Sequence, residues 1–207
     1  MTQALTKPIS FDEFTEWYPE DSILRYELHD GVIVEMAKPR GKHSKVAGFA
    51  INYLNIAIGN LHKKDIWFIP RELILKNLDG TSGYEPDIIV LDETSMVKET
   101  RWERESVIEL ADSVKLIVEV VSTNWRDDYL KKLADYEEMG IPEYWIIDHE
   151  ALGGKRFIGN PKQPTISIYQ LIDGEYQITQ FRDHDQIISP TFPTFNLTAE
   201  QIFNARL

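Results

Sequence analysis

Two apolar runs that do not alternate with polar residues constrain the fold most strongly. They span residues 87–91 (DIIVL) and 114–121 (VKLIVEVV). A strand with one solvent-exposed face alternates apolar and polar residues, whereas a strand that is buried on both faces does not. Both runs therefore predict strands of a central sheet that is covered by helices on its two faces.

A strand–helix–strand unit is expected around the second run. Residues 126–139 have helical spacing, Gly140 follows them, and Pro142 precedes the apolar stretch 143–148 (EYWIID). Glycine commonly terminates a helix, and proline cannot continue one. The pattern predicts a helix that joins two parallel strands by a right-handed crossover.

Further helices, strands and loops are expected before and after these two runs and between them. We expect an N-terminal helix after a capping-box sequence at Ser10, and a C-terminal helix capped by Thr198. A long helix is expected from Lys42 to about Leu61, and loops over 92–112 and 153–164, the first of them mobile. Strands are expected at 24–28, 32–36, 67–70, 72–76, 165–171 and 175–181, with turns after 28, 76 and 171.

The chain has the size of one domain. Its 207 residues are 43% hydrophobic, which is enough for one sizeable core and short for two. No repeat, low-complexity tract or linker interrupts it. We therefore expect a single α/β domain over residues 1–207, with its core at about 22–150.

Composition excludes several classes of chemistry. Without cysteine, the chain has no disulfide, thiolate nucleophile or cysteine-based zinc site. The first ten residues contain no apolar signal region, and no apolar run approaches the roughly 20 residues of a membrane helix. We expect a cytoplasmic protein with no membrane contact.

The charge is unevenly distributed. The net charge is 22 − 34 = −12, which disfavours binding of nucleic acid through bulk charge. Residues 36–64, however, contain six basic residues and no acid. A basic loop that leads into a helix N-terminus suits phosphate. Ordinary surface charge is the alternative reading, but a contact with DNA is expected through Lys38, Arg40, Lys42 and Lys45.

Two carboxylates interrupt or open the apolar runs. Glu119 lies inside the second run, and Asp87 opens the first directly after Pro86. Taken alone, each is explained by a structural role, as a paired strand-end residue or a turn residue. On neighbouring strands, however, the two can converge on one Mg²⁺, which prefers a few carboxylate oxygens plus water. Such a cation can activate water against a phosphodiester.

A lysine on the following helix is expected near these carboxylates. At about 100° per residue, Tyr129, Leu133 and Tyr136 define the buried stripe, with Leu130 alongside. Lys132 falls at the edge of this stripe, whereas Lys131 points away from it. A snorkelling surface lysine is the alternative for Lys132. Asp128, Lys132 and Tyr136 also form a row at spacing i, i+4, i+8, which an exposed ion pair beside an aromatic residue would equally explain.

These residues together resemble a known family. Pro86-Asp87, Glu119 in an apolar strand and the helix after it resemble the core of PD-(D/E)XK nucleases. More closely, the chain resembles the Uma-type family of restriction-endonuclease-like bacterial proteins over about residues 10–150. The matching stretches are 25–31 (RYELHDG), His43, 85–90 (EPDIIV), 118–122 (VEVVS), Asp128-x-x-x-Lys132 and 140–148 (GIPEYWIID).

The resemblance implies a restriction-endonuclease-like fold: a mixed central sheet flanked by helices, with an N-terminal helix-hairpin and a C-terminal hairpin-helix extension. It implies Asp87 and Glu119 as ligands of Mg²⁺ or Mn²⁺, and Glu27 and His43 as further pocket residues. The broader nuclease pattern has a lysine where this chain has Val121, and Lys132 matches the relocated lysine of this family.

Structural roles stay open for two of these residues. His43 is a base, a ligand or a phosphate contact, or only a histidine at a helix N-terminus. Glu27 is a pocket residue or only a surface residue of the hairpin. The four other histidines have no spacing typical of metal ligands.

Three functions are compatible with these features. The first is a Mg²⁺-dependent endonuclease that hydrolyses DNA, with Asp87, Glu119, Lys132, His43 and Glu27 as its site. The second is a binding or regulatory module that keeps the fold without turnover. The third is a metal-dependent hydrolase of a small anionic substrate.

Restriction-endonuclease-like proteins form pairs that contact both DNA strands, and we therefore expect a symmetric homodimer.

Overall fold

The computed structural model describes residues 7–19 and 23–207. Residues 1–6, most of the stretch inspected for a signal region, lie outside this description. Residues 20–22, where the expected core begins, also lie outside it.

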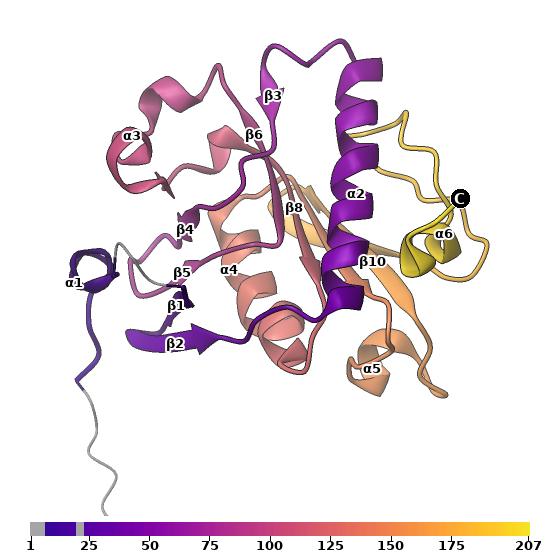
Figure 1. Cartoon of the computed structure of the whole chain (residues 1–207), viewed down its shortest axis with the longest axis horizontal. Helices are drawn as coiled ribbons and strands as arrows, with labels where there is room; N and C mark the ends of the chain where they lie inside the picture. Colours follow the sequence, from indigo (N-terminus) through magenta and orange to yellow (C-terminus); the bar gives the residue numbers. More distant parts are fainter. Residues whose placement is uncertain (1–6, 20–22) are drawn as a thin grey trace, which may run out of the picture.

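A six-stranded mixed sheet forms the centre of the structure (Figure 1). Its strand order is β11-β10-β9-β8-β6-β3. The strands are β3 (Trp67–Phe68), β6 (Ile88–Asp92), β8 (Val114–Val120), β9 (Glu143–Asp148), β10 (Thr165–Ile172) and β11 (Glu175–Phe181). Strands β8 and β9 are parallel, as the strand–helix–strand pattern predicts, and the other pairs are antiparallel.

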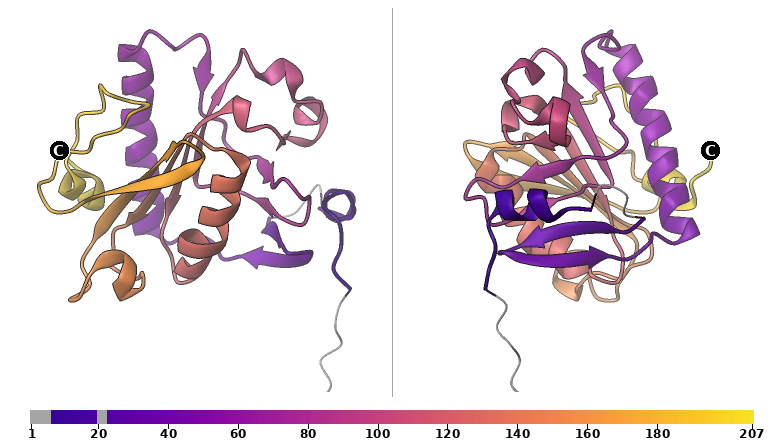
Figure 2. Two further views of the ribbon diagram at one scale, coloured as in Figure 1. Left: turned by 180° about the vertical axis from the view of Figure 1, so that it is seen from behind. Right: turned by 60° about the vertical axis from the view of Figure 1, so that its left-hand side comes forward.

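The unbroken apolar runs reflect burial on both faces of this sheet. All six residues of β9 are buried, and only Lys115 of β8 is partly exposed. On one face, Val118 and Trp145 belong to a core that includes α2 (Gly41–Asn60); Figure 2 shows this helix standing beside the sheet. On the other face, Ile117 and Tyr144 pack with α4 (Lys132–Met139).

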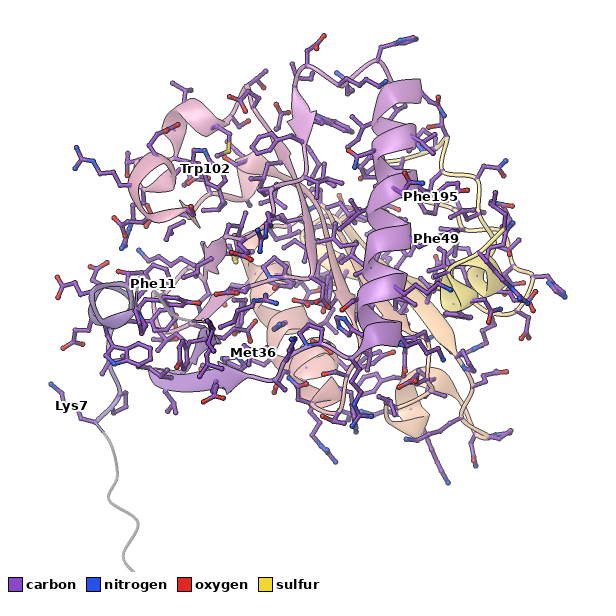
Figure 3. The ribbon with its side chains drawn as sticks, viewed as in Figure 1. Lys7, Phe11, Met36, Phe49, Trp102 and Phe195 are labelled. Atoms are coloured by element: carbon purple, nitrogen blue, oxygen red, sulfur yellow. The ribbon has the colours of Figure 1, made fainter. Side chains whose placement is uncertain are left out.

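A second sheet, of five strands, carries the N-terminal hairpin. Its order is β2-β1-β5-β4-β7. The strands are β1 (Arg25–His29), β2 (Val32–Met36), β4 (Ile74–Lys76), β5 (Gly83–Tyr84) and β7 (Val107–Ile108). The N-terminal helix α1 (Phe11–Trp17) has the expected capping box, and its Phe11 belongs to the small core of this sheet (Figure 3).

The expectation of a loop over 92–112 is wrong. This segment contains the 3₁₀ turns η1 (Met96–Lys98) and η2 (Ala111–Ser113), the helix α3 (Trp102–Glu105) and strand β7. The buried carboxylate of Glu99 accepts hydrogen bonds from the backbone N–H groups of Glu109 and Leu110, which ties the segment together. The segment 153–164 likewise contains one short helix, α5 (Lys155–Ile158).

The C-terminal elements extend the central core. The β10–β11 hairpin continues the central sheet beyond β9, and α6 (Ala199–Asn204) begins at the capping box of Thr198. The segment before α6 adds Phe195 to the α2 side of the core, where partly buried Phe49 also packs (Figure 3). Among the described residues, no helix is long and apolar enough to cross a membrane.

Candidate active site

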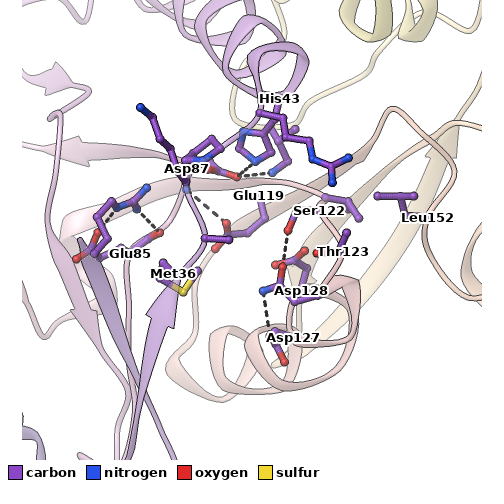
Figure 4. A pocket seen from close by; sticks show the side chains of 18 of the residues that line it. Met36, His43, Glu85, Asp87, Glu119, Ser122, Thr123, Asp127, Asp128 and Leu152 are labelled. Atoms are coloured by element: carbon purple, nitrogen blue, oxygen red, sulfur yellow. Dashed lines mark hydrogen bonds and ion pairs between the residues drawn. The ribbon is translucent and has the colours of Figure 1, made fainter. Parts of the chain in front are cut away.

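The sheet topology brings the two predicted carboxylates to one edge. Strand β6 is antiparallel to β8, so Asp87, which precedes β6, lies at the same edge as Glu119 near the end of β8. The backbone N–H of Val120 donates to Asp87 Oδ2 at 2.8 Å, and the N–H of Asp87 faces Glu119 Oε2 at 3.4 Å (Figure 4). The two residues are therefore held against each other by their own strands.

The start of α2 adds His43 to this edge. His43 Nε2 lies 3.1 Å from Asp87 Oδ2 (Figure 4). Its other ring nitrogen, Nδ1, is buried and has no hydrogen-bond partner among the described residues. His43 therefore lies at the N-terminus of α2 and also contacts the carboxylate pair, which is compatible with each of the roles open for it.

Lys132 lies at the centre of a buried charge cluster. Its side chain is 2% exposed, and Nζ lies 3.0 Å from both Glu27 Oε1 and Glu119 Oε1. Tyr136 donates its hydroxyl to the same Glu119 oxygen at 3.3 Å. Lys131 instead forms an ion pair with Asp30 at the surface. The inward orientation predicted for Lys132, and the outward one for Lys131, are both confirmed.

Glu27 is a buried residue and not a surface residue of the hairpin, although it does not line the cavity described below. It is fully buried on β1, and its Oε2 lies 2.8 Å from His29 Nε2. Its Oε1 also accepts a hydrogen bond from the backbone N–H of Glu85 at 3.0 Å. Glu27 thus links the second sheet to Lys132.

The helix that carries Lys132 begins with a wider turn than predicted. Residues Asp127–Lys131 (η3) form one π-helical turn, in which the N–H of Lys132 bonds to the carbonyl of Asp127. A π turn takes one more residue than an α turn, so the helical phase changes here. Leu130, which was expected beside the buried stripe, is 42% exposed. Asp128 is buried instead, and its Oδ1 lies 3.9 Å from Lys132 Nζ.

Burial and neighbouring charges shift the pKa values in this cluster. For Lys132, burial favours the neutral amine, but Glu119, Glu27 and Asp128 outweigh it and raise the pKa well above its usual value. For Glu27, burial is outweighed by Lys132 and His29, which lower the pKa to about 2. The lysine ammonium and the Glu27 carboxylate are therefore both charged at neutral pH.

Glu119 and Asp128 are shifted in the opposite direction. Burial raises the pKa of Glu119 to about 7 despite the attraction of Lys132, with Asp87 and Glu27 adding repulsion. Burial also raises the pKa of Asp128. More carboxylates converge here than one lysine can neutralise, so a further positive charge would be stabilised.

The carboxylates open into a cavity of about 430 Å³. Asp87, Glu119, Asp128 and Lys132 line one part of it, and three of the four basic residues expected to contact DNA line another. Those three are Lys38, Arg40 and Lys42. Lys45 is exposed and does not contribute to the lining.

Comparison with known proteins identifies the family. A family model described as "Uma2: Putative restriction endonuclease" matches residues 11–200. The chain belongs to the Uma2 family. Its fold is similar to the crystal structure of a "putative nuclease belonging to DUF820" from Anabaena variabilis ATCC 29413, with a TM-score of 0.72 and 21% identity. That similarity covers 97% of this chain and 100% of the other. No curated protein matches the chain.

The oxygen atoms at this site of the Uma2 chain fit a small divalent cation. Among the described residues, both contacts to the Asp87 carboxylate fall on Oδ2, so Oδ1 could accept a cation. Glu119 Oε1 contacts Lys132 and Tyr136, and within the same part of the chain Oε2 has only the long contact to the N–H of Asp87. Over the same residues no three His, Asp or Glu side chains form a ready metal site. Two carboxylates with water suffice for Mg²⁺.

Sequence reasoning missed two residues that line the cavity of this Uma2 protein. Asp128 was noted in a helical row and in a stretch that matches the family, but not as a site residue, and it is buried beside Lys132. His149 was assigned nothing, but it follows β9, whose carboxyl end lies at the same edge as that of the parallel strand β8. Its place after the apolar stretch 144–147 (YWII), separated from it only by Asp148, was the signal that marked it.

Proposed function

We propose that this protein is a divalent-metal-dependent endonuclease of the PD-(D/E)XK type that hydrolyses DNA phosphodiester bonds. Membership of a family described as "Putative restriction endonuclease" supports nuclease function. The observation that supports the metal-dependent mechanism is the pair Asp87 and Glu119, which is held together by neighbouring strands, lines the cavity and is contacted by Lys132.

In this proposal Asp87 and Glu119 would hold Mg²⁺ or Mn²⁺, which would activate a water molecule and neutralise phosphate charge. Lys132 keeps one oxygen of Glu119 fixed, so the other is presented toward the cavity. Glu27 holds Lys132 in place from the second sheet, and His43 orients Asp87. Lys38, Arg40 and Lys42 would contact the DNA backbone on the basic side of the cavity, with Lys45 beside it.

Plasmid cleavage with Mg²⁺ or Mn²⁺ tests this proposal. Asp87→Asn and Glu119→Gln should each abolish cleavage, and calorimetry with Mn²⁺ should show one site that both substitutions remove. Asp112→Asn changes an exposed carboxylate that precedes β8, at the opposite end of this strand from Glu119, so this variant serves as the control and should cleave normally. Wild-type protein that cleaves no DNA with any divalent metal would contradict the proposal and favour a binding module without turnover.

The remaining expectations belong to the same proposal. One carboxylate pair would cut one strand, so we propose that two copies form a symmetric dimer and act in the cytoplasm on both strands of a duplex. Light scattering at micromolar concentration measures the mass, and a species of 24.0 kDa alone would contradict the dimer.

A further inference from the structure

The basic part of the cavity contains a polar side chain that the proposed hydrolysis does not use. His149 lies in the turn after β9 and is only 4% exposed. Neither of its ring nitrogens has a hydrogen-bond partner among the described residues. Buried polar atoms nearly always have partners, because leaving one unpaired costs about 1–3 kcal/mol. An imidazole kept here without a partner therefore points to a ligand.

The first turn of α2 lies against the same part of the cavity. Lys42 and His43 line it together with His149, and both contribute positive charge that, after burial, lowers the pKa of His149. The helix has 20 residues, and no side chain caps its N-terminus; its first turn contains no acidic residue. Free N–H groups and the positive end of the helix dipole are thus available to an anion.

The only acidic side chain described beside Lys42 binds it loosely. Glu150 Oε1 lies 3.6 Å from Lys42 Nζ, and both side chains are partly exposed. An ion pair of this kind contributes little. An anion that binds Lys42 in place of Glu150 would therefore lose little free energy by breaking this ion pair.

We propose that the N-terminus of α2, Lys42 and His149 form a phosphate-binding subsite that takes a DNA backbone phosphate next to the bond held at Asp87 and Glu119. The inference rests on the proposed function, and it adds how the DNA backbone would be positioned relative to the carboxylate pair. His43 belongs to both places: it contacts Asp87 through Nε2 and lines the cavity beside Lys42. A phosphate in the subsite would thereby place the neighbouring phosphodiester at the carboxylate pair.

Binding of inorganic phosphate to the full chain, in metal-free buffer, tests the subsite without any cleavage. In amide NMR spectra, Gly41, Lys42 and His43 should shift in a saturable way, as should the ring of His149. His149→Leu should weaken phosphate binding at least tenfold, and Glu150→Gln should strengthen it severalfold by releasing Lys42. Lys64→Ala, which removes one charge at the other end of α2, should leave binding unchanged.

A fold-stability measurement separates binding from misfolding. Because His149 lacks partners, His149→Leu should keep or raise the melting temperature while phosphate binding falls. A short DNA duplex should compete with inorganic phosphate for the same amide shifts. Unchanged phosphate binding in His149→Leu, or scattered unsaturable shifts, would overturn the subsite. Phosphate binding that DNA does not displace would overturn its assignment to the DNA backbone. These outcomes are independent of whether the protein cleaves DNA.

Discussion

Lys132 and Lys131 are neighbours with opposite surroundings, and they should differ sharply in function. Lys132→Ala leaves Glu27 and Glu119 without their buried cation, so stability should fall by about 3–5 kcal/mol. DNA cleavage, measured well below the melting temperature, should fall at least about 100-fold. Lys131→Ala removes two partly exposed ion pairs, with Asp30 and with Asp135, and should be nearly silent. Equal losses of cleavage in the two variants would contradict the assignment.

The raised pKa of Glu119 makes metal binding depend on pH. With its pKa raised to about 7 by burial, Glu119 is protonated below that pH, and a cation must displace the proton. Mn²⁺ affinity, measured by calorimetry, should therefore weaken by up to about tenfold per pH unit as pH falls below 7. Above pH 8 the affinity should level off. A flat affinity between pH 5.5 and 8 would show that Glu119 does not bind the cation as a carboxylate.

Residue patterns located this site only in part. Glu119 and Asp87 were accessible to sequence reasoning because a carboxylate beside an apolar run must be compensated. The inward phase of Lys132 followed from helical periodicity, but the burial of Asp128 and the exposure of Leu130 did not. The burial of Asp128 and the exposure of Leu130 both depend on the π turn at Asp127–Lys131, and no residue type in this stretch predicts such a turn.

Among the elements, long buried strands were predictable and short ones were not. The apolar runs that form β8 and β9 predict the bounds of these strands nearly to the residue. A strand that is buried on both faces is apolar at almost every position, so its length can be read from the sequence. Strands β5 and β7 have two residues each, and the pairings of β5 with β1 and of β7 with β4 join distant parts of the chain. Local patterns contain no information on such pairings.

Two glycines with different backbone conformations should respond oppositely to alanine. Gly48 lies inside α2 with nothing within 4 Å of an added Cβ, so Gly48→Ala should stabilise the protein by about 0.5–1 kcal/mol. Gly140 ends α4 at φ +85°, a left-handed conformation that disfavours a side chain. Gly140→Ala should destabilise by about 1 kcal/mol.

Urea denaturation of both glycine variants measures the difference directly. Phosphate binding by Gly48→Ala should stay at the wild-type level, since the substitution lies beyond the first turn of α2. Changes of the same sign in the two variants would contradict the backbone argument.

At the scale of the whole molecule, charge decides how DNA can approach. The chain carries −12 overall, yet residues 36–64 carry six basic residues and no acid. Three of those basic residues line the cavity at one end of α2, and Lys63 and Lys64 follow its other end. A molecule of this kind repels DNA over most of its surface, and binding must depend on the cavity end of that segment.

Matched pairs of substitutions distinguish this local contact from bulk charge. Replacing Lys38 and Arg40 by Ala removes the same charge as replacing Lys63 and Lys64. Each phosphate neutralised contributes about −0.9 to the slope of log K against log salt concentration. In metal-free buffer, the first pair should therefore make the slope shallower by about 1.8, as measured by fluorescence anisotropy with a short duplex. The second pair should leave the slope at its wild-type value. Equal slopes for the two double variants would mean that DNA responds only to net charge, and the basic side of the cavity would not be its contact.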